Sequence, residues 1–183
     1  MDTLIFVGQA FSITLPILLS GLFFIASMKF GWFKALDKPI DFGFKFGKAD
    51  LFGPNKNWRG ALIYIIGGTV VTYLLHLMQT SRNWIAPVFG NNPLILGLAF
   101  CSTYVLGELA NSFIKRRIGI APGSGGNFFQ KFIDNTDGAL ATGLVFVFMY
   151  NVPIELLLVS LAISLVIHAS TDVLMRRLKL KSK

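Results

Sequence analysis

The sequence predicts an all-α integral membrane protein with about five transmembrane helices and two polar cytoplasmic loops. The first observation is composition: 54% of the residues are hydrophobic and 14% are charged, whereas soluble domains carry about 25% charged residues. The second is that the apolar residues form long runs, near the ~20 residues that cross ~30 Å of hydrocarbon. The third is that lysine and arginine gather in a few intervals between these runs. We treat residues 1–183 as one membrane domain.

The predicted transmembrane helices are apolar segments separated by polar or turn-forming residues. A helix satisfies its backbone groups internally, as the bilayer interior requires. The first segment follows no Lys or Arg and exceeds the apolar part of a signal peptide, so we expect it to remain as an anchor. The fourth is short unless Phe132 and Ile133 extend it, so a broken or re-entrant helix is an alternative. The segments are residues 3–28, 60–79, 93–114, 138–151 and 154–175.

The positive charges predict the orientation of the chain. Of the 17 lysines and arginines, all but Arg82 lie in the loops 29–59 and 115–137 or after the last segment. The positive-inside rule then places the N-terminus outside, and both loops and the C-terminus in the cytoplasm, in a multi-pass protein of the cell membrane. Contact with anionic membrane lipids accounts for the net charge of +8, so we expect no nucleic-acid partner. Cys101, the single cysteine, excludes an internal disulfide and is interpreted as packing.

The first loop ends in a cluster of amides and cations. Its earlier part, residues 29–50, alternates aromatic residues with lysines, which is typical of a segment in the lipid headgroups. Asn55, Lys56 and Arg59 then stand just before a predicted helix, whose free N–H groups favour an anion. The alternative is structural, because Asn57 is a suitable N-cap for that helix.

The third segment carries an acidic residue toward its cytoplasmic end. In a helix, Glu108, Ser112 and Lys115 share one face at i, i+4 and i+7, with Asn111 beside them. A carboxylate inside the bilayer is costly and indicates a functional site. The alternative is an internal ion pair of Glu108 with Lys115 or Arg116.

The second loop combines cations with a glycine-rich turn. Lys115, Arg116 and Arg117 stand at a helix C-terminus, where cations are favoured in any case. The turn at residues 122–126, Pro-Gly-Ser-Gly-Gly with Gly123 at its second position, lets backbone N–H groups approach an anion closely. Together these features predict a polyphosphate ligand.

Two aspartates complete the second loop. Asp134 and Asp137 are three residues apart at the start of a helix, and one or two carboxylates with substrate phosphates are the usual ligands of Mg²⁺. The alternative is helix capping, with Asp134 as N-cap and Asp137 at the third helical position. Farther along, His168 and Asp172 are spaced i, i+4, which favours a hydrogen bond within the helix bundle over a metal or acid–base pair.

On these motifs the chain resembles the CDP-archaeol synthase family, which is related to bacterial phosphatidate cytidylyltransferases. The resemblance runs from about residue 36 onward, and the first helix carries no motif. The combination of a Lys-containing turn before Trp-Arg-Gly, a cation triplet and an Asp-x-x-Asp pair is fairly specific. The matching stretches are KPIDFG (38–43), LFGPNKNWRG (51–60), SFIKRR (112–117), Pro122-Gly123, IDNTDG (133–138) and His168.

The resemblance implies a membrane enzyme whose active site lies in its cytoplasmic loops. Family members condense CTP with an archaeal lipid phosphate, 2,3-di-O-geranylgeranylglyceryl phosphate, in phospholipid biosynthesis; they release pyrophosphate and require Mg²⁺. Asp134 and Asp137 would bind the metal and, with Lys115 and Arg116, form the catalytic group. The positions expected to bind substrate are Asn55, Lys56, Arg59, Glu108, Ser112, Arg117 and Gly123.

The chain also departs from the family pattern. Glu108 stands where the family usually has Asp, and the aspartate pair lies in an Asp-Asn-Thr-Asp-Gly context instead of one like Asp-Gln-Leu-Asp-Phe. One alternative is therefore the same chemistry on phosphatidic acid or another lipid phosphate. The other is a non-catalytic membrane protein that binds anionic lipid or nucleotide. Assembly as a homo-oligomer stays open.

Overall fold

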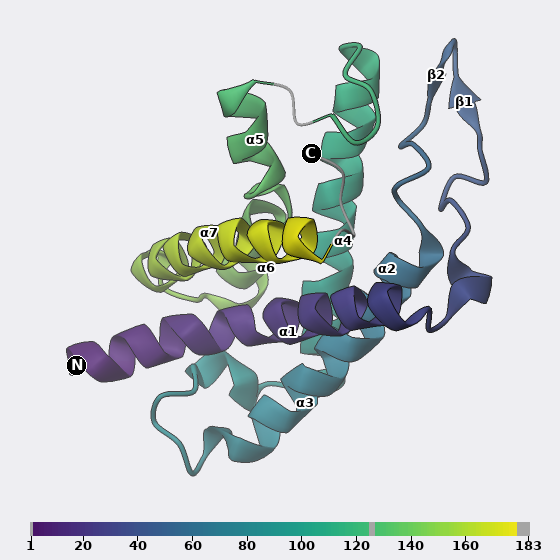
Figure 1. The fold of residues 1–183 in the computed structure, drawn as a ribbon. Helices are drawn as coiled ribbons and strands as arrows, with labels where there is room; N and C mark the ends of the chain where they lie inside the picture. Colours follow the sequence, from purple (N-terminus) through teal and green to yellow (C-terminus); the bar gives the residue numbers. More distant parts are fainter. Residues whose placement is uncertain (1, 125–126, 179–183) are drawn as a thin grey trace.

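The chain forms a bundle of tilted helices, with its two long loops at one end (Figure 1). The computed structural model describes residues 2–124 and 127–178. In chain order the elements are α1 (Thr3–Phe30), η1 (Lys34–Leu36), β1 (Lys45–Phe46), β2 (Ala49–Asp50), α2 (Trp58–Leu62), η2 (Ile63–Gly67), α3 (Gly68–Gln79), η3 (Pro87–Gly90), α4 (Pro93–Arg117), α5 (Phe128–Asp134), α6 (Asp137–Tyr150) and α7 (Ile154–Arg177).

Four helices of the described residues are long and apolar enough to cross a membrane. They are Thr3–Phe30, Trp58–Gln79, Pro93–Arg117 and Ile154–Met175. The fourth predicted segment is also helical, but α6 has only 14 residues, about 21 Å of helix against ~30 Å of hydrocarbon. Phe132 and Ile133 do not extend it, since they belong to α5. The prediction of a helical membrane protein is confirmed, whereas the number of crossings and their orientation stay predictions.

The ends of the elements differ from the expected ones around both loops. α4 continues to Arg117, so the cation triplet is helical. The second loop contains α5, and the first contains a two-stranded antiparallel hairpin in which Lys45 pairs with Asp50. Neither was expected in an all-α protein with plain polar loops. The N-cap prediction is confirmed, because the Asn57 side chain accepts a hydrogen bond from the Gly60 N–H at 2.9 Å.

Two glycines let α4 and α6 cross at very short distance. A Cβ atom added to Gly107 would lie 2.7 Å from the Ala141 Cβ and 2.7 Å from the Asp137 carbonyl oxygen. A Cβ atom on Gly138 would lie 2.6 Å from the Tyr104 ring. This crossing places the first turn of α6, which begins at Asp137, directly against α4.

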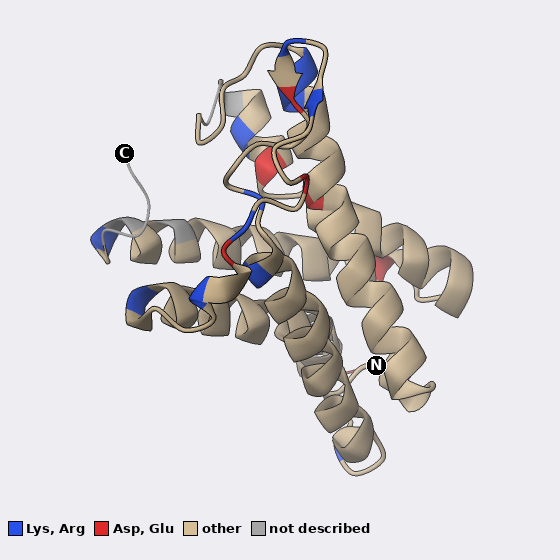
Figure 2. Cartoon of the chain, turned by 90° about the vertical axis from the view of Figure 1, so that its right-hand side faces the viewer, with Lys and Arg blue, Asp and Glu red and all other residues tan. Residues whose placement is uncertain are grey.

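The apolar core lies away from the two long loops, among α1, α3, α4, α6, α7 and the segment around η3. Phe89, Phe100 and Phe146 are almost fully buried there, and Cys101 packs with them, as predicted. Many other apolar side chains are exposed on the outer helix faces, where lipid would cover them. Figure 2 shows the charged residues concentrated around the loops and nearby helix ends, with isolated positions elsewhere.

Candidate active site

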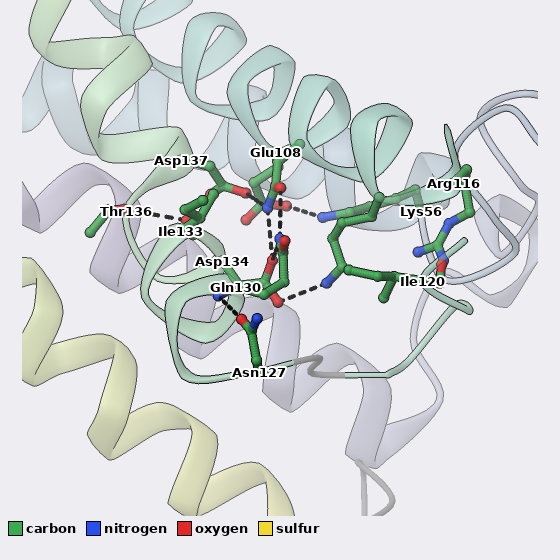
Figure 3. A network of polar contacts seen from close by, with 12 residues as sticks. Lys56, Glu108, Arg116, Ile120, Asn127, Gln130, Ile133, Asp134, Thr136 and Asp137 are labelled. Atoms are coloured by element: carbon green, nitrogen blue, oxygen red, sulfur yellow. Dashed lines mark hydrogen bonds and ion pairs between the residues drawn. The ribbon is translucent and has the colours of Figure 1, made fainter. Parts of the chain in front are cut away.

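The first loop reaches α4 through an ion pair. The Lys56 Nζ lies 2.6 Å from the Glu108 Oε2, and both side chains are largely buried. Burial alone would lower the pKa of Lys56, but the charge and hydrogen bond of Glu108, together with the charges of Asp137 and Asp134, hold that pKa above its ordinary value. Glu108 thus pairs with Lys56 of the first loop instead of Lys115 or Arg116, the partners of the alternative interpretation, and Figure 3 shows the contact.

Backbone pairing within the first loop fixes the position of Lys56. The Ile40 N–H donates to the Lys56 carbonyl at 2.8 Å. The buried Asp41 carboxylate accepts hydrogen bonds from the Phe52 and Gly53 N–H groups. Burial would raise the pKa of Asp41, but these backbone donors hold it below its ordinary value. The KPIDFG stretch (38–43) thus holds the turn that carries Lys56 in place through these hydrogen bonds.

The two aspartates converge on one side chain of α4. The Asn111 Nδ2 donates to the Asp134 Oδ1 and to the Asp137 Oδ2, each at 2.8 Å. The Lys115 Nζ lies 2.7 Å from the Asp134 Oδ2. Gln130, one turn before Asp134 in α5, donates to the Asp134 Oδ1 at 3.2 Å and to the Asn111 Oδ1 at 3.1 Å. Figure 3 shows Asp134, Asp137 and Gln130 around this point.

The aspartate pair does not form the capping box that was the alternative interpretation. Asp134 ends α5, whereas α6 begins at Asp137 with Thr136 as its N-cap residue. The Thr136 side chain makes no capping hydrogen bond to α6. The two carboxylates come from different helices, so their shared direction is a feature of the tertiary structure.

The pKa values of the two aspartates shift in opposite directions. Burial would raise the pKa of Asp134, but Lys115, Asn111 and Gln130 hold it below its ordinary value. The pKa of Asp137 rises to about 6, because burial and then the negative charge of Glu108 disfavour its ionised form. A divalent cation between the aspartates would relieve this repulsion.

The donor set fits Mg²⁺ held jointly by protein and substrate. Within residues 2–124 and 127–178, no three His, Cys, Asp or Glu side chains group closely enough to hold a metal. Two carboxylates are present, with the Asn111 amide between them. Magnesium characteristically takes one or two carboxylates and fills its remaining positions with water and phosphate oxygens.

Each of the three predicted arginines contacts a residue of the first loop. Arg59 lies 3.1 Å from the Asp37 carboxylate. Arg116 donates to the Phe52 carbonyl at 3.0 Å and also to the Ile120 carbonyl. Arg117 donates to the Asp50 carbonyl. Arg116 and Arg117 thus fix the first loop next to α4, whereas Arg59 pairs within that loop. A role of the three arginines in phosphate binding stays a prediction.

The remaining predicted positions lie near the ion pair or at the loop contact. Asn55 lines a small pocket together with Lys56 and Glu108. Ser112 is buried one turn beyond Glu108. Gly123 has φ of +78°, a backbone conformation that favours glycine. A Cβ atom on Gly53 would lie 3.0 Å from the ring of Pro122, so the turn contacts the first loop; Gly125 and Gly126 lie outside the described residues.

An apolar chamber adjoins the charged groups. This cavity of about 440 Å³ lies among α1, α4, α6 and α7, and most of its lining is aliphatic or aromatic. Glu108 and Asp134 line it beside Tyr64, Tyr104 and His168. The sequence interpretation did not identify the chamber, although Tyr104 precedes Glu108 by one helical turn and so shares its face.

His168 makes the predicted bundle hydrogen bond. Its Nε2 lies 3.0 Å from the Tyr104 hydroxyl oxygen, so α7 contacts α4 near the site. The Asp172 side chain, the other member of the predicted i, i+4 pair, lies outside the described part of the structure.

Fold and site together define a helical membrane protein with a charged site beside an apolar chamber. Residues 12–183 match the family described as CDP-archaeol synthase, CarS-like. The chain therefore belongs to the CDP-archaeol synthase family.

Individual relatives agree with this assignment. The CDP-archaeol synthase of Pyrobaculum arsenaticum is 32% identical over 148 residues, which cover 79% of this chain and 80% of that protein. The CDP-archaeol synthase of Pyrococcus furiosus is 33% identical over 153 residues, covering 79% and 81%. A solved structure of an intramembrane enzyme for archaeal membrane lipid biosynthesis has the same fold. It covers 90% of this chain and 92% of its own, with a TM-score of 0.65 and 22% identity.

Proposed function

We propose that this protein transfers the cytidylyl group of CTP to a membrane lipid phosphate, forming a CDP-lipid and pyrophosphate. The proposal rests on the position of the charged cluster next to the apolar chamber. Glu108 and Asp134 belong to the ion pairs of the cluster and also line the chamber. A nucleotide and a lipid phosphate need these two environments side by side. Membership of the CDP-archaeol synthase family supports the same chemistry.

The reaction requires mainly that two anions be held together. An oxygen of the lipid phosphate attacks the α-phosphorus of CTP, and the bond to the bridging oxygen of the β-phosphate breaks. The electron pair leaves with pyrophosphate, so no nucleophilic side chain is needed. Positioning and charge neutralisation supply the rate enhancement.

The lysines and aspartates have distinct roles in this proposal. Lys56 and Lys115 contact carboxylates in this structure and are placed to donate to phosphate oxygens when substrate arrives. Asp134 and Asp137 would hold Mg²⁺, which when bound neutralises the phosphates and the developing charge on pyrophosphate. Asn111 orients both carboxylates. We place this site on the cytoplasmic face, where the positive-inside rule puts the two loops.

The direct test uses purified protein in detergent with CTP labelled at the α-phosphate, Mg²⁺ and a panel of lipid phosphates. The panel contains geranylgeranylglyceryl phosphate and phosphatidic acid, so it also identifies the acceptor. We expect labelled CDP-lipid with at least one acceptor and none without Mg²⁺. Folded protein that forms no product with any acceptor would refute the proposal and favour a non-catalytic binding protein.

Two variants test the assigned roles within the same assay. Asp134→Asn and Asp137→Asn preserve side-chain size and remove a metal-binding charge, so each should abolish product formation. The matched control is Asp50→Asn, in the hairpin, where the carbonyl and not the carboxylate makes the contact to Arg117. Full activity in both α5–α6 variants would contradict the metal assignment.

A further inference from the structure

His168 is the one side chain, among the described residues lining the chamber, that can carry a positive charge. The other charged lining residues are Glu108 and Asp134, and both are acidic. Lys56 and Lys115 are not in that lining and contact these carboxylates instead. A phosphate at the end of a lipid in this chamber would meet two carboxylates and one imidazole.

Tyr104 fixes the imidazole at the level of the charged site. Its hydroxyl oxygen lies 3.0 Å from the His168 Nε2, and the two rings are nearly parallel, at 22°. Tyr104 is 2% exposed and also stacks on Tyr64, with ring centroids 5.4 Å apart. Because Tyr104 and Glu108 are one turn apart on α4, His168 lies where the apolar chamber meets the ionic cluster.

We propose that His168, oriented by Tyr104, binds the phosphate monoester of the acceptor lipid. The inference rests on the proposed function and deepens it by assigning the recognition of the acceptor headgroup. A phosphate entering an apolar cavity loses its hydration and needs a donor or a positive charge in return. An imidazole supplies an N–H donor in either protonation state and a positive charge when protonated, and charge-assisted hydrogen bonds to phosphate are the stronger kind.

This assignment separates the two phosphate-bearing substrates. Lys56 and Lys115 lie on the loop side, with the aspartate pair, and serve the nucleotide. His168 lies on the chamber side and serves the lipid. The acceptor oxygen would then be held between His168 and the α-phosphorus, so a lipid without phosphate could fill the chamber without gaining the His168 contact.

The test measures lipid binding without nucleotide or metal. Radiolabelled dialkylglycerol phosphate and the matching dialkylglycerol, which lacks the phosphate, are bound to purified protein in detergent. We expect His168→Gln to weaken binding of the phosphorylated lipid by about ten-fold, the equivalent of one charge-assisted hydrogen bond. Binding of the dialkylglycerol should not change, and His168→Lys, which restores a cation, should recover most of the loss.

Further variants distinguish recognition from packing. Tyr104→Phe keeps the ring and removes the hydroxyl, so it should give a smaller loss for the phosphorylated lipid alone. Ser170→Ala is the matched control on α7, because that exposed hydroxyl donates to the Val166 carbonyl of its own helix. Excess inorganic phosphate should compete weakly, since it lacks the apolar chains; full displacement by it would show a free-phosphate site and overturn the lipid assignment.

The outcomes for this inference and for the proposed function are independent. Equal binding of the phosphorylated lipid by wild type and His168→Gln would overturn the inference, even if CDP-lipid forms. An equal loss for both lipids would also overturn it, because His168 would then only shape the chamber. His168-dependent lipid binding without any product from CTP would refute the enzymatic function alone.

Discussion

Gly107→Ala tests whether the close crossing of α4 and α6 positions the active site. The added Cβ would lie 2.7 Å from both the Ala141 Cβ and the Asp137 carbonyl oxygen, whereas carbon atoms pack at about 3.5–4.0 Å. The helices must therefore separate by about 1 Å. The backbone that moves belongs to Asp137, one of the two proposed metal ligands.

The predicted effect is large for activity and small for stability. A misplacement of about 1 Å can cost about 100-fold in rate, so we expect kcat/KM for CDP-lipid formation to fall by that order. Overpacking costs about 1–3 kcal/mol, and Ala recovers up to about 1 kcal/mol in helix propensity over Gly. The melting temperature should therefore fall by only a few degrees.

The assay pairs initial rates with thermal melting of the same preparations. Leu106→Ala is the control, because Leu106 is next in sequence yet 61% exposed on the outer face of α4. Wild-type kcat/KM in Gly107→Ala would refute the idea that this crossing positions Asp137. A loss of activity that only follows unfolding would do the same.

Three further predictions concern the charges and the loop. Asp137→Asn should raise the melting temperature relative to wild type in EDTA, since the raised pKa of Asp137, about 6, makes its ionisation costly in the folded state. The gain in melting temperature should be absent below pH 3.8, the ordinary pKa of this carboxyl group, should grow as the pH rises through 6, and should then level off. A gain that does not depend on pH would contradict this prediction. Glu108→Asp should raise KM for CTP, because the shorter chain opens the 2.6 Å contact with Lys56; a large gain in activity would instead mark Glu108 as a specialisation. Arg117→Lys should speed tryptic cleavage at the exposed hairpin lysines, since Lys cannot bind the Asp50 carbonyl while lying against the Phe46 ring; an unchanged cleavage rate would show that Arg117 does not dock the hairpin.

The site residues that the sequence singled out are those whose chemistry is local, and their roles stay predictions. Asp134 and Asp137 were identified because two closely spaced carboxylates are typical ligands of Mg²⁺. Glu108 stood out because a charge within an apolar helix is costly. Lys56 was identified through its neighbours in the turn before α2. In each case the residue type and its immediate surroundings carried the signal.

Side-chain partners could not be predicted in the same way. The arginines were expected to contact phosphate, yet Arg116 and Arg117 donate to backbone carbonyls of the first loop. Which acceptor a long side chain reaches depends on segments more than 60 residues away in sequence. The hydrogen bond of Gln130 to α4 was absent from the site prediction. The hydrogen bond of His168 within the helix bundle was predicted, but its partner Tyr104 was not, because the neighbouring residues do not indicate which helix face lies opposite.

By itself, then, the sequence determined a helical membrane protein with apolar spans and a few costly charged residues at one end. These properties follow from the transfer of individual residues into a bilayer, which depends on composition and local order. Only the tertiary structure decided that two aspartates from different helices share Asn111, and that an apolar chamber with His168 opens beside them. Those relations arise where helices cross, and the closeness of the crossing at Gly107 and Gly138 is set by packing between segments.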